Sequence, residues 1–193
     1  MTELENYIQS YFGFSQSNEL NTIGSLFKTQ KIEKGEFLLK SGQNCDKLVF
    51  ISSGIIRIYA LHDGEEITQW ISVKGGFVTD LASLIFDSPA RWNIQALTNA
   101  DLYVIHKEDY RKIGNIIPKW HELEKLFIAK CFIMLEDRVF GFLSLSAEER
   151  YHIFFENNKS LFNEVPLQFI ASMLGMTPET FSRIRKKVKP EIS

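Results

Sequence analysis

Residues with the chemistry of base recognition lie close together near the C-terminal end of the chain. Glu179, Thr180 and Arg183 are spaced so that a helix beginning near residue 178 presents all three in its first turns. An arginine donates two hydrogen bonds to the acceptors of a guanine, and a glutamate accepts one from the amine of a cytosine. Side chains that can donate hydrogen bonds to phosphate oxygens surround these base-contacting residues. They are Ser182, Arg185, Lys186 and Lys187.

The segment 167–187 has the pattern of a helix-turn-helix. Ala171 is small where two crossed helices approach, and Gly175 stands where the turn needs a positive φ. Thr177 is expected to cap the second helix, with Pro178 in its first turn. The second helix of this motif lies in the major groove of DNA, so we count Thr177 with the predicted DNA-binding residues. The alternative interpretation is a plain helical hairpin.

The charge distribution separates this end from the rest of the chain. Residues 175–189 carry five cations and one acid, whereas the whole chain of 193 residues has a formal net charge of −2. Such asymmetry is expected when one end faces phosphates. The composition, 45% hydrophobic and 24% charged with no long apolar run, argues against a membrane protein. An acidic start unlike a signal peptide, together with only two cysteines, predicts a cytoplasmic protein.

The middle of the chain has the pattern of a β domain. Short runs of β-branched and aromatic residues recur about every 8–12 residues, with glycine-containing turns between them. The pair Asp63-Gly64 is typical of a hairpin turn. Helical spacing occupies the first thirty residues. We therefore expect an α+β fold whose N-terminal domain, residues 1–116, is a jelly-roll-like double-stranded β-helix.

The spacing of apolar residues after Pro118 predicts a helix of about 25 residues with a broad apolar face. Packing onto the β domain would cover this face, and so would a second copy of the helix, because steps of three and four are also a coiled-coil spacing. We expect a homodimer through residues 117–143. A capping box, Ser146 with Glu149, then begins a C-terminal domain, residues 144–193. The apolar positions are Trp120, Leu123, Leu126, Phe127, Cys131, Ile133 and Met134.

A β-rich domain, a long helix and a terminal helix-turn-helix together resemble the Crp–Fnr family of bacterial transcription regulators. Residues 34–59 look like the opening of the family's cyclic-nucleotide-binding β-roll, and residues 175–183 are similar to its recognition helix. The resemblance implies that Glu179 and Arg183 read bases in double-stranded DNA. An arginine that the family often carries before the glutamate is Pro178 here, and the β-wing of many members is not expected. The resemblance also makes RNA polymerase a candidate partner.

The family's effector site is a phosphate cassette, a Gly-Glu-Leu segment followed by Arg-Ser about ten residues later. Thr79 stands in place of the glycine and Asp80 in place of the glutamate. The arginine position falls on Ala90 and the serine position on Arg91. Cyclic AMP or cyclic GMP remains an alternative beside a different small ligand or none, and no cofactor is expected. The candidate effector contacts are Thr79, Asp80, Leu81, Ala90, Arg91 and Trp92.

Two further classes of protein stay open. A jelly roll is also the fold of metal-dependent cupin enzymes, which need clustered histidine and glutamate ligands, but the four histidines are scattered. No nucleophile motif or phosphate-binding glycine loop occurs, so neither an enzyme nor a metal site is expected. The other class is a ligand-binding or protein-interaction module without specific DNA binding, against which the retained Glu179 and Arg183 argue. The histidines are His62, His106, His121 and His152.

Overall fold

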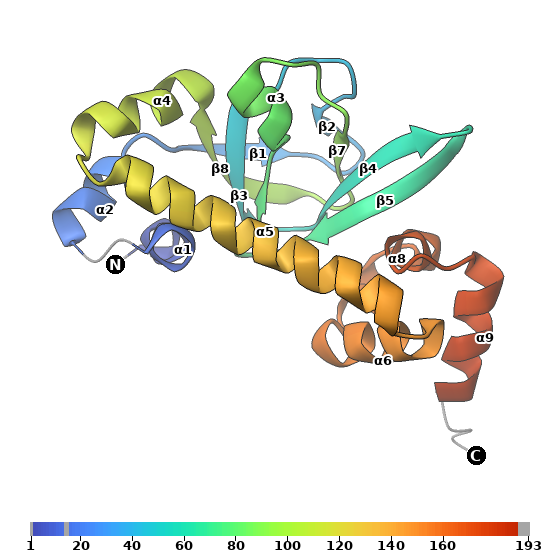
Figure 1. Cartoon of the computed structure of the whole chain (residues 1–193). Coiled ribbons are helices and arrows are strands. Elements are labelled where there is room, and N and C mark those ends of the chain that lie inside the picture. The colour runs from blue at the N-terminus through green and yellow to red at the C-terminus, as the bar shows by residue number, and fades with distance from the viewer. Residues whose placement is uncertain (1, 14–15, 189–193) are drawn as a thin grey trace.

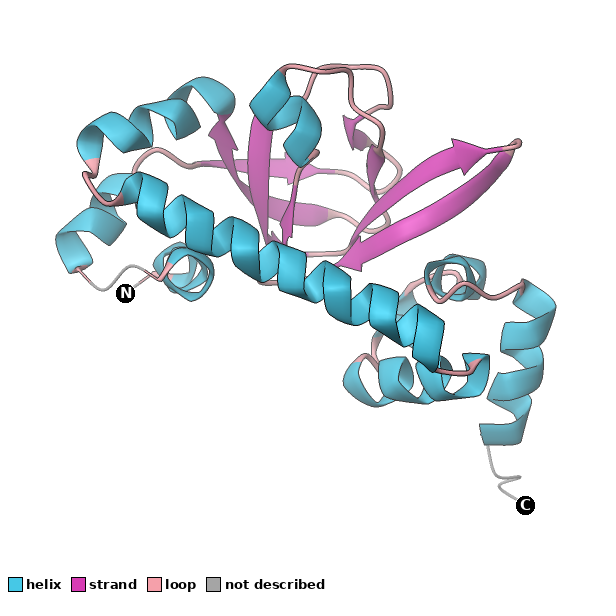
Figure 2. Cartoon of the chain, viewed as in Figure 1, coloured by secondary structure: helices cyan, strands magenta, loops and turns pink. Residues whose placement is uncertain are grey.

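The chain folds into a β-rich part and a smaller helical part, and one long helix runs along both (Figure 1). The computed structural model describes residues 2–13 and 16–188. Two short helices, α1 (Glu3–Phe12) and α2 (Ser17–Gly24), precede the strands. The described strands gather in one part of the molecule, and the described residues after α5 form helices and loops without a strand (Figure 2). Within the described residues, no helix has the length and apolar character needed to cross a bilayer.

The strands form two four-stranded antiparallel sheets, with the orders β1-β8-β3-β6 and β2-β7-β4-β5. Most successive strands alternate between the sheets, which winds the chain into a roll, so the expected β-roll is confirmed. The first sheet contains β1 (Lys28–Ile32), β8 (Ala100–His106), β3 (Lys47–Ser53) and β6 (Phe77–Val78). The second contains β2 (Phe37–Leu39), β7 (Asn93–Ala96), β4 (Ile56–His62) and β5 (Glu65–Ser72).

The turn between β4 and β5 has the predicted chemistry. Asp63 has a φ of +50° and Gly64 a φ of +83°, as a two-residue hairpin turn requires. The hairpin extends from the body of the roll, and β5 forms an edge of its sheet (Figure 1).

Two helices inside the β domain complete the roll. The short helix α3 (Leu81–Phe86) follows β6, and α4 (Lys107–Ile116) follows β8. Helical spacing after residue 106 was predicted, whereas α3, β1 and β6 were not. The strand β1 has four exposed residues in five, so it carries no apolar pattern, and its pairing with β8 alone defines it.

The long helix α5 (Trp120–Ser144) has 25 residues, as expected, but begins two residues after Pro118, which lies in the preceding turn. Trp120 and Phe127 are buried in the core of the roll, where the Phe127 ring stacks on Phe12 at 4.6 Å. Leu126, which was expected to widen the apolar face, is 51% exposed, so the roll does not cover it. Neighbouring residues point about 100° apart around a helix, so Leu126 and the buried Phe127 lie on different faces. Apolar residues occur on nearly all sides of α5, so the roll can cover only some of them.

Four helices follow α5 and share a second hydrophobic core. They are α6 (Ala147–Asn157), α7 (Leu161–Glu164), α8 (Leu167–Met173) and α9 (Pro178–Val188). The predicted capping box at the start of α6 is confirmed: the Ser146 hydroxyl accepts from the Glu149 amide, and the Glu149 carboxylate accepts from the Ser146 amide. Tyr151 and Phe181 meet edge to face in this core, which also includes Ile71 from the second sheet.

Candidate functional site

The turn between α8 and α9 has the predicted local geometry. Gly175 has a φ of +67°, and Pro178 is the first residue of α9. The Thr177 hydroxyl accepts a 3.2 Å hydrogen bond from the Thr180 amide, which satisfies one of the free amides at the start of the helix. These contacts set the direction in which α9 leaves the turn.

The exposed side of α9 is hollowed and mainly basic. An open hollow of about 610 Å³ runs along it. The opposite side of α9 buries Phe181 and Ile184 in the second hydrophobic core, which fixes the exposed side outward. Thr180 and Arg185 are half-buried at the margins. The residues lining the hollow are Glu179, Ser182, Arg183, Lys186 and Lys187.

The charges on α9 differ in how far they are engaged. Lys187 pairs with Glu148 of α6 at 3.5 Å, whereas Arg183 and Lys186 have no ion pair among the described residues. The backbone amide of Glu179, and then the Thr177 hydroxyl, lower the pKa of the Glu179 carboxyl. Glu179 is therefore ionised at neutral pH and can only accept hydrogen bonds.

Two arginines that sequence reasoning missed hold the end of α8. The Arg138 Nη2 donates a 2.9 Å hydrogen bond to the Met173 carbonyl, and the Arg150 Nε donates a 3.1 Å hydrogen bond to the Leu174 carbonyl. Met173 is the last residue of α8 and Leu174 is its C-terminal cap, where a helix leaves acceptors unpaired. The sequence feature that could have pointed to Arg138 is its position as a cation within a long and mostly apolar helix.

The cassette region of the roll is held together by Asp80. This residue caps α3 and is 3% exposed. Its Oδ1 accepts from the Ser83 amide at 3.0 Å, and its Oδ2 accepts from the Arg91 and Trp92 amides at 2.9 and 3.4 Å. Both carboxylate oxygens are therefore engaged within the chain.

The other cassette residues do not converge on Asp80 with their side chains. The Arg91 side chain is exposed and lies over the Trp92 ring, with its guanidinium carbon 4.6 Å from the ring centroid. Ala90 is buried, Leu81 is half-buried, and the Thr79 hydroxyl donates to the Lys47 carbonyl at 2.9 Å. The structure thus brings the backbone of residues 91–92 to Asp80, but no arginine side chain.

The space inside the roll beside this cassette is small. The cavity has a volume of about 10 Å³, and Leu38, Leu39, Val49, Val78 and Ile94 line much of it. A volume of about 10–15 Å³ is the least that holds a single water. This cavity is too small for a nucleotide.

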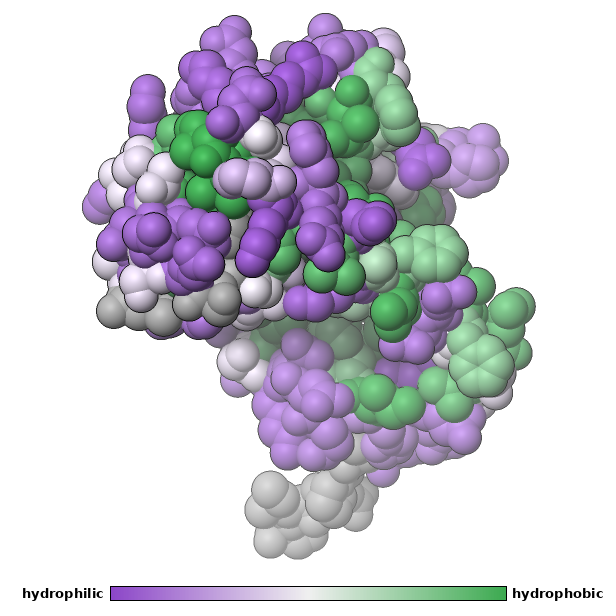
Figure 3. Space-filling view, turned by 60° about the vertical axis from the view of Figure 1, so that its left-hand side comes forward, coloured by the Kyte–Doolittle hydropathy of each residue, from purple (hydrophilic) through white to green (hydrophobic). Residues whose placement is uncertain are grey.

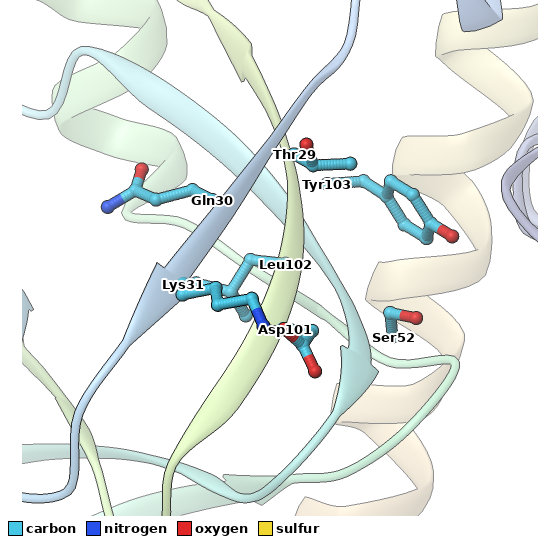
Figure 4. A pocket seen from close by; sticks show the side chains of 7 residues that line it. All are labelled: Thr29, Gln30, Lys31, Ser52, Asp101, Leu102 and Tyr103. Carbon is cyan, nitrogen blue, oxygen red and sulfur yellow. Dashed lines mark ion pairs between the residues drawn. The ribbon is translucent and has the colours of Figure 1, made fainter.

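A larger hollow, of about 260 Å³, lies on the first sheet rather than at the cassette (Figure 4). Lys31 and Asp101 face each other across adjacent strands with a 3.5 Å ion pair, and Thr29 and Tyr103 lie beside them. Both charges are well exposed, so the pair is screened by water. The hollow holds no group whose chemistry points to a reaction.

The residues described by the structure contain no cluster of three or more histidine, cysteine, aspartate or glutamate side chains able to hold a metal ion. The four histidines are all exposed and remain apart. No observation therefore supports the cupin-like alternative.

Comparison with known proteins identifies the domain type of the roll. Residues 29–115 match the family model of the cyclic nucleotide-binding domain. The cAMP-dependent protein kinase regulatory subunit of Dictyostelium discoideum is 29% identical over 103 residues, which are 53% of this chain and 31% of that protein. The chain thus matches less than a third of the length of this relative. The relative is by its name a regulatory subunit, and neither match is to a catalytic family.

Solved structures extend the similarity beyond the roll. FixK2 of Bradyrhizobium japonicum superposes with a TM-score of 0.71 at 18% identity, covering 84% of each chain. The catabolite activator protein of Thermus thermophilus superposes with a TM-score of 0.59 at 19% identity, covering 92% of this chain and 85% of that one. At these identities the likeness concerns the fold. The β-roll of this chain matches the cyclic nucleotide-binding domain, and the arrangement of the roll and the helices that follow it is similar to that of catabolite activator-type structures.

Proposed function

We propose that the chain is a sequence-specific DNA-binding transcription regulator of the Crp–Fnr type. The observation that carries this proposal is the exposed side of α9, on which Glu179 and Arg183 lie at the start of a capped helix beside Lys186 and Lys187. In this proposal, residues 1–116 are the sensor domain, residues 117–143 are the dimerisation helix, and residues 144–193 are the DNA-binding domain, which we call the reader.

The chemistry of α9 suits base recognition at its start and phosphate contact along its length. Arg183 donates both hydrogen bonds of its guanidinium fork to one guanine, and Glu179 accepts from a cytosine amine. Ser182, Lys186 and Lys187 supply donors to the backbone, which sets register and orientation. Glu179 is anionic, so it adds selectivity and weakens non-specific attraction to phosphates.

The exposed side of α5 supports a dimer, with a second copy of the chain as its occupant. Apolar side chains continue at steps of seven along the face opposite the buried one, as a helix pair requires. Figure 3 shows apolar side chains gathered along the right-hand edge of the molecule, whereas the upper part is mostly hydrophilic. The exposed fractions reach 82% at Leu143. The apolar residues are Leu126, Ile128, Phe132, Ile133, Leu135, Val139, Phe140 and Leu143.

A dimer would also meet the geometry of DNA. Two copies of α9 related by a two-fold axis bind half-sites about 34 Å apart on an inverted repeat. The test is Val139→Glu, which places a charge in the middle of the apolar face. We expect it to sediment as a monomer, while Phe86→Glu, at an even more exposed apolar position on α3, leaves the dimer intact. A monomeric wild-type chain at tens of micromolar would contradict the proposal.

The DNA-binding proposal is tested with duplexes selected from a randomised library. We expect steep loss of affinity with salt and a specific excess over random duplex. Arg183→Ala should cost about 1–3 kcal/mol and relax preference at one base position. Lys112→Ala removes an exposed cation from α4 as the matched control and should leave binding unchanged. Flat, weak binding to every duplex would favour the alternative of a ligand-binding or protein-interaction module.

A further inference from the structure

The edge of β5 is covered by α8, the first helix of the proposed helix-turn-helix. β5 is the edge strand of its sheet, and α8 lies against it (Figure 1). The Thr68 amide donates a 2.9 Å hydrogen bond to the Ser172 hydroxyl, and the Gln69 carbonyl accepts from the Arg138 Nη1. An exposed sheet edge leaves such backbone groups without partners. Here α8 and α5 supply the partners that a further strand would supply.

A buried arginine lies at this contact. Arg57, on β4, is 1% exposed, and its guanidinium carbon lies 3.6 Å from the ring centroid of Phe169 on α8. Its Nε donates to the Thr68 hydroxyl at 2.9 Å, and its Nη1 pairs with the Glu66 carboxylate at 2.5 Å. The Nη2 of Arg57 has no hydrogen-bond partner in the part of the chain that the structure describes.

This arrangement is specific in geometry but poorly suited to a permanent clamp. Burying a cation costs free energy that one ion pair recovers only in part, and apolar residues of similar volume often serve stability better. The Glu66 side chain is itself 45% exposed, so its attraction for Arg57 is weakened by water. The unpartnered Nη2 adds a further cost. A contact of this kind favours a defined position for α8 without making it irreversible.

The position of α8 is transmitted to α9. The two helices share one core, in which Ile170 and Phe181 are buried, so they move as a unit. A displacement of α8 along β5 therefore displaces Glu179 and Arg183 relative to α5.

We propose that the contact of Arg57 and the β5 edge with Phe169 and Ser172 is the joint through which the roll sets the position of the reading helix. In this proposal the chain binds its specific DNA when these contacts are formed, a state that we call the closed joint. Arg57 is the residue that positions α8 in that state. This inference rests on the proposed function, since it assigns the regulation of the DNA-binding surface. A ligand or partner that moves the β4–β5 hairpin would act by its different affinity for the closed and open joints.

The test compares Arg57→Met and Phe169→Leu with Arg111→Met. The first two remove the cation or the ring from the joint. Arg111→Met removes an exposed arginine of α4, whose ion pair with Asp87 lies outside the joint. Amide hydrogen exchange of the full-length chain measures how often the contact between α8 and β5 opens. The affinities for the selected duplex and for random duplex measure sequence-specific DNA binding.

We expect both joint variants to raise exchange at least tenfold in residues 167–188 and at the Thr68 amide, while β3 and β8 stay protected. Specific affinity falls at least tenfold, and random-duplex affinity stays within twofold, because the cations of α9 are unchanged. Arg111→Met behaves as wild type. If Arg57→Met does not fold, Phe169→Leu and Ser172→Ala test the same joint. Unchanged exchange, or unchanged specific affinity in an opened joint, overturns the inference.

Failure of the proposed function has a different signature. A wild-type chain that binds no duplex refutes DNA reading, whereas the exchange measurement does not involve DNA. Increased exchange in residues 167–188 then still establishes the joint, and unchanged exchange refutes it.

Discussion

Arg138 of α5 donates a hydrogen bond to the carbonyl of Met173, the last residue of α8. The same guanidinium donates to the Gln69 carbonyl of β5, so one side chain connects the long helix, the roll and the C-terminal helices. Burial lowers the pKa of Arg138, yet an arginine remains charged at every pH at which the chain folds. The connection is therefore independent of pH over the physiological range.

Arg138→Met should destabilise the chain by about 1–3 kcal/mol, because two carbonyls lose their charged donor while the apolar stem is kept. The measurement is urea unfolding followed by circular dichroism. Arg111→Met is the control, since it removes an arginine whose ion pair with Asp87 is exposed, and it should cost less than about 1 kcal/mol. Equal losses in the two variants would show that the Arg138 hydrogen bonds contribute no more than a surface pair.

Gly175→Ala should destabilise the turn for two separable reasons. The φ of +67° is strained for any residue with a Cβ, and that Cβ would lie 2.8 Å from Cε1 of Phe142. We expect a loss of about 1–3 kcal/mol in thermal unfolding. Gly42→Ala is the matched control, because Gly42 has a φ of +87° and open space around it, so it reports the backbone cost alone.

The double variant Gly175→Ala with Phe142→Leu separates the two causes further. Shortening the side chain on α5 relieves the close approach, so the double variant should be more stable than the sum of the two single changes predicts. If the two single losses of unfolding free energy simply add in the double variant, then Phe142 already moves aside without cost in Gly175→Ala.

The features of the reader that were predictable from sequence are local ones. Gly175, Thr177 and Pro178 each satisfy a rule that involves only a few neighbouring residues, and the Asp63-Gly64 turn does the same. The type of the β domain was also accessible, because the spacing of strands and turns is a property of the sequence itself.

The features that sequence reasoning missed depend on residues far apart in the chain. Arg57 and Phe169 are separated by more than one hundred residues, and nothing near either of them indicates that they stack. The face of α5 that packs on the roll was not separable from the exposed face, because apolar residues surround the helix. Asp80 was read as a candidate effector contact, and its engagement by the Arg91 and Trp92 amides depends on how the loop folds back.

Asp80→Ala should destabilise the roll by about 1.5–3 kcal/mol, the range for hydrogen bonds to a charged group, because one buried and two partly buried amides lose their acceptor. Chemical unfolding measures the loss. Asp46→Ala is the control, since this exposed acid borders the same small cavity and makes only long ion pairs with Lys47 and His106. A loss no larger than that of the control would mean that water replaces the Asp80 carboxylate freely.

The wild-type chain should show no rise in melting temperature with cyclic AMP or cyclic GMP at millimolar concentration. The Asp80 oxygens are engaged, no arginine side chain faces them, and the adjoining cavity has about 10 Å³. A ligand present at one hundred times its Kd stabilises a protein by about 2.7 kcal/mol, so specific binding would be visible in the melting curve. A concentration-dependent rise with either nucleotide would contradict this reading of the cassette.

Glu3 provides a pH-dependent attachment of α1 to the roll. Its carboxylate pairs with the Lys74 ammonium at 2.7 Å and accepts from the Ser52 hydroxyl at 2.7 Å, and these contacts lower the pKa of Glu3 from 4.5 to about 2. Because the folded chain has the lower pKa, the stabilisation by Glu3 is fully present above about pH 4.5 and is lost as the pH falls through about 2.

The difference in unfolding free energy between wild type and Glu3→Gln should therefore be constant at neutral pH and shrink between about pH 4.5 and 2. Lys74→Met removes the largest cause of the lowered pKa, so in that background the difference should be smaller and should shrink over a narrower range of pH. Urea unfolding at half-unit pH steps provides the measurement. Curves for wild type and Glu3→Gln that stay parallel down to pH 2 would show that the carboxylate contributes nothing to the attachment of α1.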